Sequence, residues 1–191
     1  LEKYDMLKYV EEGGTFLLNS PYPADDVWTK IPVEVQQAVI DKKLDFYVID
    51  ASSIAEECGM GSRINVIMQT AFFKISGVLP EDEAIELIKK AIVKTYGKKG
   101  QDIVDKNITT VDIAASKIHK VEYPGQSSGD LHMAPAVPDH APEFVKEVTG
   151  EIIAGRGLKI PVSKLPDDGT YPTGTTKYEK RNIAEFIPVW D

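Results

Sequence analysis

The sequence predicts an α/β fold in which a parallel or mixed sheet contains a βαβ unit and is flanked by helices. Residues 15–19 and 44–50 are largely apolar runs without alternation, a pattern typical of strands covered on both faces. Residues 32–40, between them, begin with proline and then repeat apolar residues at helical spacing. A strand, a helix and a second strand within ~35 residues indicate a parallel βαβ unit.

Short helices are predicted on both sides of this unit. Residues 3–10 form one that ends before a glycine pair, and residues 52–57 form another that Ser52 or Ser53 caps. Residues 63–76 are apolar on nearly every side, which indicates a buried helix. Gly77 is placed to end it.

Two packed antiparallel helices are predicted next. Residues 81–96 begin with three acidic residues, which favour the positive pole of a helix, and carry an apolar stripe. Residues 101–119 repeat such a stripe. We interpret this helical pair as scaffold.

The composition changes at Val121. Proline and glycine break every periodicity across residues 121–142, which we interpret as a linker lying over the surface. Residues 143–154 form a short helix, and the remainder is mostly loop. The predicted division is therefore an α/β domain over residues 1–120, a linker over 121–142 and a small loop-rich domain over 143–191.

The composition excludes several classes of function. The chain has 191 residues and a formal net charge of −8, which does not suit a nucleic-acid surface. Cys58 is its only cysteine, so its own thiolates cannot ligate an iron–sulfur cluster. The three histidines lack metal-ligand spacing, and no apolar run approaches the ~20 residues that cross a membrane. With no signal peptide and a start at Leu1, we expect a fragment of a cytoplasmic protein.

The strongest candidate binding site lies at residues 59–65. Gly59 and Gly61 permit positive φ and the close approach of a ligand or another backbone. Ser62 is placed to open the next helix, with Arg63 and Asn65 in its first turn. The alternative interpretation is a glycine turn followed by a helix cap.

Two polar residues follow the predicted strands. Asn19 and Asp50 lie where open α/β sheets bind ligands, so they could line one crevice with residues 59–65. Asp50 is more readily interpreted as the cap of the next helix. The sequence contains no dinucleotide fingerprint, Walker loop, nucleophile elbow or pair of catalytic carboxylates. We therefore predict no catalytic residue and no metal ligand in this chain.

Residues 59–65, together with residues 68–70, resemble a segment of the large pyruvate:ferredoxin (flavodoxin) oxidoreductases of anaerobes. Residues 13–20, 77–80, 91–100 and 178–181 fall in the same order in that family. The resemblance covers most of the chain apart from the predicted linker. It implies that residues 1–120 are the later part of a γ-type α/β domain, whose N-terminal part is missing, and that the small connecting (EKR) domain follows.

For the whole enzyme, the resemblance implies oxidative decarboxylation of pyruvate to acetyl-coenzyme A. It implies thiamine diphosphate and [4Fe–4S] clusters as cofactors, coenzyme A as substrate, ferredoxin or flavodoxin as electron acceptor, and an intact homodimer. This chain is expected to bind none of the cofactors, to be inactive alone, and to have the remaining domains of the same polypeptide as partners. Gly59, Gly61, Arg63 and Asn65 would lie at a coenzyme A-binding or interdomain edge.

The charge triplet Glu179, Lys180 and Arg181 belongs to a connecting domain under this resemblance. A guanidinium offers a bidentate fork to a carboxylate, so an interdomain clamp is one interpretation and a solvated triplet is the other. Two further classes of function stay open. The chain could be a non-catalytic interdomain scaffold module or a free-standing nucleotide-binding α/β protein.

Overall fold

The computed structural model describes residues 4–179 of the chain. They form two compact units: residues 9–131 make the α/β unit, and residues 4–8 with 132–179 make what we call the C-terminal unit. These limits differ from the predicted boundaries at residues 120 and 142. In the α/β unit the strands are β1 (Thr15–Asn19), β2 (Asp45–Ile49) and β3 (His119–Lys120), and the helices are α1 (Val33–Asp41), α2 (Ala51–Glu57), α3 (Asn65–Ser76), α4 (Glu81–Tyr96) and α5 (Gln101–Ser116).

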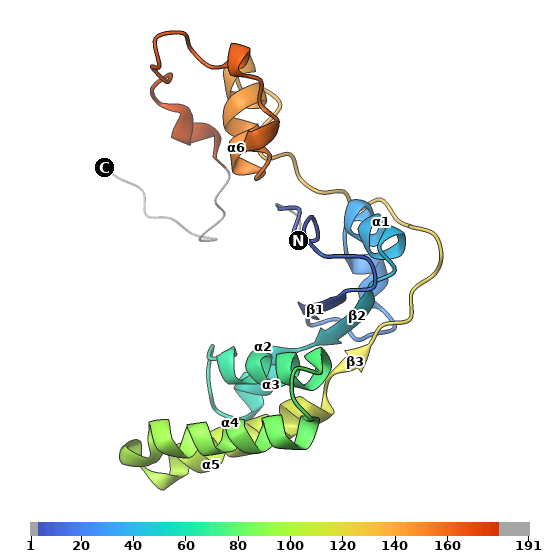
Figure 1. Ribbon diagram of the computed structural model, residues 1–191, viewed down its shortest axis with the longest axis vertical. Coiled ribbons are helices and arrows are strands. Elements are labelled where there is room, and N and C mark those ends of the chain that lie inside the picture. Colours follow the sequence, from blue (N-terminus) through green and yellow to red (C-terminus); the bar gives the residue numbers. More distant parts are fainter. Residues whose placement is uncertain (1–3, 180–191) are drawn as a thin grey trace, which may run out of the picture. The chain divides into compact units, whose positions relative to one another are not determined.

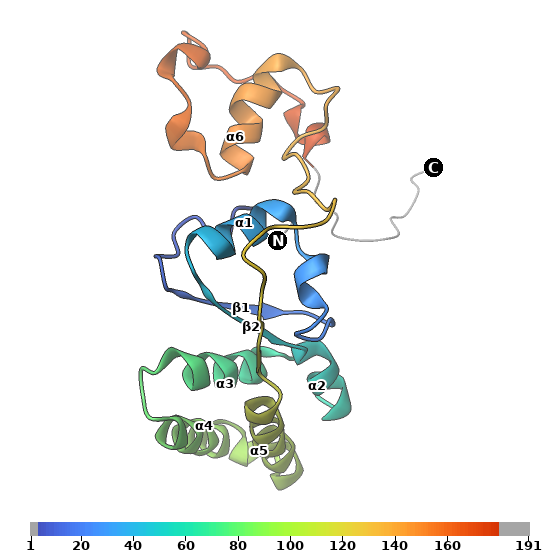
Figure 2. The ribbon, with the colours of Figure 1, turned by 90° about the vertical axis from the view of Figure 1, so that its right-hand side faces the viewer.

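The α/β unit is built on a three-stranded mixed sheet in the order β1-β2-β3. β1 and β2 are parallel, with Phe16 opposite Phe46 and Leu18 opposite Val48. Helix α1 covers one face of this sheet, and α2 and α3 lie on the other face with α4 and α5 beyond them (Figures 1 and 2). The predicted α/β class and its βαβ unit are confirmed.

The face of the sheet that α2 and α3 cover packs against a buried apolar cluster. Ile49 at the end of β2, Ile54 of α2 and Ile67 of α3 are almost fully buried in one cluster, against which Leu17 of β1 packs. Helices α4 and α5 run antiparallel, as predicted, and contact each other and α3. Gly77 ends α3 in the left-handed conformation with φ 63°, which confirms the predicted stop.

The segment after α5 differs from its prediction. The helix expected over residues 101–119 ends at Ser116, and His119–Lys120 instead pair antiparallel with β2. The backbone N–H of Val121 then donates to Phe46 O at 2.8 Å. This pairing competes successfully with helix propensity because it satisfies backbone groups of the buried strand β2.

Residues 121–131, which we call the strap, lie on the α/β unit and are bound to it by side-chain contacts. Tyr123 stacks on Trp28 with ring centroids 5.2 Å apart, and its hydroxyl donates to Leu44 O at 2.8 Å. Burial raises the pKa of Tyr123. Further along, the buried Gln36 of α1 bonds both backbone groups of Ser128. Side-chain contacts of high sequence separation therefore hold a segment whose composition alone predicts a linker.

The C-terminal unit is small and rich in turns. Its described helical segments are a π-helical turn over Val145–Thr149, helix α6 (Gly150–Ile153) and the 3-10 turns Gly157–Lys159, Val162–Lys164 and Thr175–Tyr178. A core of Val137, Ala141 and Val145 packs against Tyr178. Residues 3–10 were expected to form a helix, but residues 6–9 form only turns, and the Nζ of Lys8 donates to Gly155 O at 3.2 Å.

Candidate functional site

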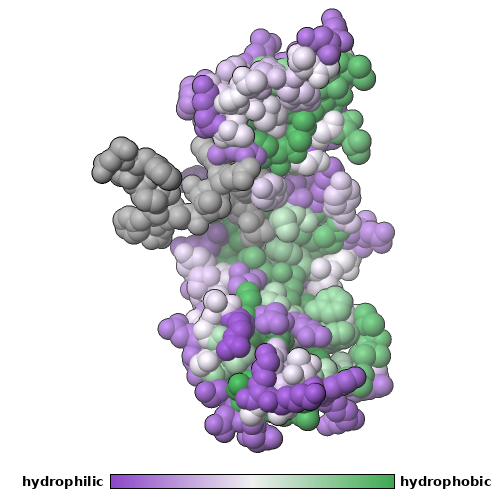
Figure 3. Space-filling view, turned by 90° about the vertical axis from the view of Figure 1, so that its left-hand side faces the viewer, coloured by the Kyte–Doolittle hydropathy of each residue, from purple (hydrophilic) through white to green (hydrophobic). Residues whose placement is uncertain are grey.

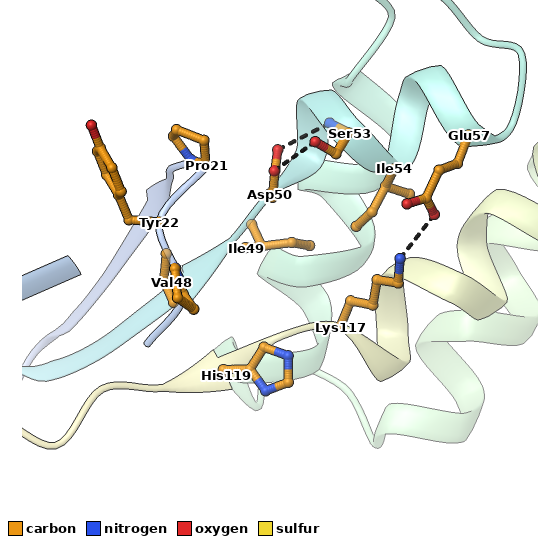
Figure 4. Close-up of a pocket in the computed structure, with 11 residues that line it drawn as sticks. Pro21, Tyr22, Val48, Ile49, Asp50, Ser53, Ile54, Glu57, Lys117 and His119 are labelled. Atoms are coloured by element: carbon orange, nitrogen blue, oxygen red, sulfur yellow. Dashed lines mark hydrogen bonds and ion pairs between the residues drawn. The ribbon is translucent and has the colours of Figure 1, made fainter. Parts of the chain in front are cut away.

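A crevice of about 280 Å³ opens at the carboxyl ends of β1 and β2 (Figure 4). Its walls come from the end of β2, the turn after β1, helix α2 and the chain that leaves α5. In Figure 4, Tyr22 lies on one side and Glu57 and Lys117 on the other, with His119 of β3 below. Open α/β sheets bind ligands at this edge, because the loops that leave parallel strands diverge there.

Asp50 forms the upper wall and caps helix α2. One carboxylate oxygen accepts from Ser53 N at 2.9 Å and the other from the Ser53 hydroxyl at 2.7 Å. Asn19 reinforces the same turn, since its side-chain oxygen accepts from Ala51 N at 2.9 Å. The expectation that Asp50 serves as a cap is confirmed, whereas a cap at Ser52 or Ser53 is wrong. Both strand-end side chains therefore hold the backbone that shapes the crevice.

The opposite wall carries an ion pair and an imidazole. Lys117 Nζ lies 2.9 Å from Glu57 Oε2, and both side chains are about half exposed. His119 is exposed at the crevice, and Tyr22 presents a phenol ring with Lys30 Nζ 5.7 Å from its centroid. An aromatic face, a cation and an imidazole can bind a polar ligand. The Ser53 hydroxyl of this lining bonds the Asp50 carboxylate, and that bond belongs to the cap of helix α2.

The predicted site residues at 59–65 lie elsewhere. None of them lines this crevice, so the expected clustering with the strand ends does not occur. Gly59 and Gly61 have φ of 66° and 61°, and open space surrounds the position of a Cβ on either. Met60 between them is buried in the core cluster. The two glycines thus let the chain reverse around a buried methionine.

Arg63 and Asn65 are both exposed. Arg63 Nε donates to Met60 O at 3.1 Å, a bond within the turn that precedes α3. Ser62 does not cap the next helix, because α3 begins at Asn65 and its N-cap position is Ile64.

Helix α3 is also less buried than predicted. Asn65, Gln69 and Phe72 lie on one exposed stripe at helical spacing, and Phe72 is 52% exposed. The apolar composition of this helix therefore conceals one surface-facing stripe. The predicted ligand or interdomain role of Asn65 stays a prediction.

The charge triplet is only partly described. Glu179 follows the last 3-10 turn, and its backbone N–H donates to Thr176 O at 3.0 Å. Lys180 and Arg181 lie outside the described residues. The interdomain clamp stays a prediction.

The described residues do not suit an iron–sulfur cluster or another metal. They contain no group of three or more His, Cys, Asp or Glu side chains that could hold a metal ion. Cys58, the only cysteine of the chain, packs half-buried against the core cluster, whereas such clusters need several thiolates. Within residues 4–179, no helix has both the length and the apolar character to cross a membrane.

Tyr22, Lys117 and His119 were missed by the sequence reasoning. Assigning residues 101–119 to one helix placed Lys117 and His119 on a scaffold face. The alternation of charged and apolar residues from Lys120 to Tyr123 is a signal of a short strand that could have corrected this. Tyr22 lies three positions after the end of the first strand, between two prolines.

Comparison with known proteins gives two family matches along the chain. Residues 1–117 match the family described as pyruvate ferredoxin/flavodoxin oxidoreductase, and residues 130–184 match EKR, a domain of unknown function. The whole chain is 51% identical over 192 residues to a putative pyruvate-flavodoxin oxidoreductase of Synechocystis sp.. It is 48% identical over 188 residues, 98% of the chain, to the pyruvate:ferredoxin oxidoreductase of Moorella thermoacetica.

The chain spans 16% of the length of each of these two relatives. A further relative, the mitochondrial pyruvate dehydrogenase [NADP(+)] of Euglena gracilis, is 40% identical over the whole chain, which spans 11% of that protein. The name of that relative gives NADP(+) as its electron acceptor.

Proposed function

The chain belongs to the pyruvate ferredoxin/flavodoxin oxidoreductase family, and from this premise we propose that it is part of an enzyme that decarboxylates pyruvate oxidatively to acetyl-coenzyme A. The observation that carries the proposal is identity near 50% along the entire chain, through both the α/β unit and the C-terminal unit. In the proposed enzyme, carbon dioxide leaves pyruvate, the acetyl group forms a thioester with coenzyme A, and two electrons pass to ferredoxin or flavodoxin.

The role proposed for this chain is positioning rather than chemistry. Thiamine diphosphate would supply carbanion stabilisation in the whole enzyme, and [4Fe–4S] clusters would carry the electrons. A single cysteine does not suit the clusters, so we assign both cofactors to other domains. The homodimer and the cytoplasmic location of the intact enzyme stay predictions.

Two surfaces of the α/β unit support a contact with coenzyme A or a neighbouring domain. The first is the crevice at the strand ends, where Tyr22, Lys117 and His119 offer an aromatic face and hydrogen-bond donors. The second is the loop with Gly59, Gly61, Arg63 and Asn65. An exposed guanidinium beside two unobstructed glycines leaves room for a phosphate or a carboxylate. Glu179, Lys180 and Arg181 are proposed to contact a neighbouring domain.

Substitution of Arg63 in the parent enzyme tests the second surface. Arg63→Met should lower kcat/KM for coenzyme A about tenfold or more, since a lost bond to a charged group costs about 1.5–3 kcal/mol. Its melting temperature should stay unchanged, because the side chain is exposed. Lys90→Met, which removes an exposed cation on α4, is the matched control. Unchanged kinetics for Arg63→Met would favour the scaffold alternative.

The chain by itself provides a second test. Purified residues 1–191 should show no pyruvate-dependent reduction of viologen and no bound iron. Stoichiometric iron with the absorbance of a cluster would contradict the assignment of cofactors to other domains.

A further inference from the structure

Strand β1 lies at the edge of the described sheet although its sequence is that of an interior strand. Phe16 and Leu18 are half-buried, whereas their register partners on β2, Phe46 and Val48, are 0% and 2% exposed. Each pair shares one face of the sheet, so the difference arises from the missing neighbour on the outer side of β1.

The backbone groups on this outer side can be identified from the hydrogen bonds on the inner side. Asp45 N donates to Gly14 O at 2.9 Å, and Ser20 N donates to Ile49 O at 3.0 Å. In a parallel ladder, alternate residues direct both backbone groups to the same neighbour. The even-numbered residues of β1 therefore face β2, and the N–H and C=O groups of Thr15, Leu17 and Asn19 face outward.

This edge has none of the usual protection. β1 contains no lysine, no proline and no charged side chain. Its flanks are apolar on both faces, since Phe16 stacks on Phe46 at 5.0 Å on one face and Leu17 packs into the core cluster on the other. Figure 3 faces the side of the α/β unit on which β1 lies, and it shows hydrophobic residues gathered on the surface at the level of the sheet.

These observations indicate which segment pairs with the outer edge of β1. Parallel sheets occur with their strands buried, and a parallel neighbour requires a crossover of about a dozen residues or more. The chain spans 16% of its relatives, so most of such a polypeptide lies outside residues 1–191. We propose that the outer edge of β1 pairs with a further strand supplied by the remaining part of the same polypeptide, which extends this sheet. The proposal rests on family membership and is independent of the proposed activity.

Hydrogen exchange of the parent polypeptide at single-residue resolution tests this pairing. A paired edge protects all five amides of β1, so those of Thr15, Leu17 and Asn19 should exchange about a hundredfold more slowly than amides of exposed turns. An alternating pattern, with Phe16 and Leu18 protected and the three outward amides fast, would overturn the proposal. Protection that is lost when the enzyme is diluted to monomers would assign the edge to a second copy and would also overturn it.

A substitution gives an independent readout. Thr15→Pro removes one outward N–H, and Thr15→Val is the control that keeps it with good strand propensity. In the parent polypeptide, Thr15→Pro should speed the exchange of the Leu17 and Asn19 amides at least about tenfold relative to Thr15→Val. Equal exchange in the two variants would show that the edge has no partner strand. Neither measurement uses pyruvate turnover, so failure here is distinguishable from failure of the proposed function.

Discussion

Replacing Gln36 by methionine should release the strap from the α/β unit. Gln36 is 1% exposed, and its side-chain amide lies at the centre of four contacts. Nε2 donates to the carbonyls of Trp28 at 2.9 Å, Ile31 at 3.0 Å and Ser128 at 2.9 Å. Oε1 accepts from Ser128 N at 2.7 Å. Methionine keeps the length of the side chain and loses every one of these bonds.

The loss of stability can be worked out from the bonds that the side-chain amide can make. Its two N–H hydrogens serve three carbonyls, so one hydrogen is shared and the donated bonds count as two. With the bond that Oε1 accepts, three net bonds are lost. At about 1 kcal/mol for each net bond, and with buried carbonyls left unpaired, the free energy of unfolding should fall by about 2–4 kcal/mol. For a chain of this size the melting temperature should fall by about 5–15 °C.

Thermal unfolding followed by near-ultraviolet circular dichroism reports this loss, because the stacked Trp28 and Tyr123 contribute to the signal. Gln37→Met is the matched control: Gln37 neighbours Gln36 but is exposed, with bonds to Asp41 and Ser127, and its replacement should change stability by about 0.5 kcal/mol or less. Equal shifts for the two variants would refute the reasoning.

Gln36→Glu adds a test with a defined sign. Three carbonyls and burial disfavour the carboxylate, so the folded-state pKa of this glutamate should lie above its unfolded value of about 4.3. A raised acid pKa stabilises the fold below that pH and destabilises it as the pH rises. Part of the lost stability should therefore return near pH 4, whereas Gln36→Met should show no such recovery.

Three further outcomes are expected. The hydrogen bond from Arg156 lowers the pKa of Glu151, so this pair stabilises the C-terminal unit above about pH 4.3. That stability is lost as the pH falls. Arg156→Gln should make the hydrogen exchange of α6 depend less on pH between about pH 5 and pH 3. Gly59→Ala should lower the free energy of unfolding by about 1–2 kcal/mol in urea titrations, because φ is 66° and no atom obstructs the new methyl group; an unchanged midpoint would contradict the strain argument. Limited digestion with subtilisin should cut first within residues 132–140, and a first cut inside the strap would show that its contacts do not persist in solution.

Local signals were sufficient for the central architecture. The two buried strands and the helix between them follow from uninterrupted apolar runs and a proline at the helix start. The end of α3 at Gly77 follows from the left-handed conformation that glycine adopts at little cost. The cap at Asp50 was equally accessible, since its side chain bonds a backbone group three residues away.

Non-local contacts account for what the sequence did not predict. β3 and the strap exist because Val121, Tyr123 and Ser128 bond residues within the range 36–46, which lie more than 70 positions earlier. The sequence pattern within residues 117–131 does not show which distant residues these three side chains and backbone groups bond. The same limitation applies to the crevice, because Lys117 and His119 reach it only through the return of the chain beside β2. The role of residues 59–65 stays a prediction.

The C-terminal unit is discontinuous in sequence, and this has a consequence for the order of folding. Its two stretches are separated by about 120 residues, and holding the ends of such a flexible loop together costs about 4 kcal/mol in entropy. In the folded α/β unit, Lys42 Nζ bonds Val10 O at one end of α1, and Val33 N bonds Leu131 O at the other. Nine helical residues span only about 13 Å, against about 60 Å for the unfolded loop. The α/β unit therefore acts as a template that brings the two stretches into proximity, and it should fold first, with the C-terminal unit assembling on its chain ends.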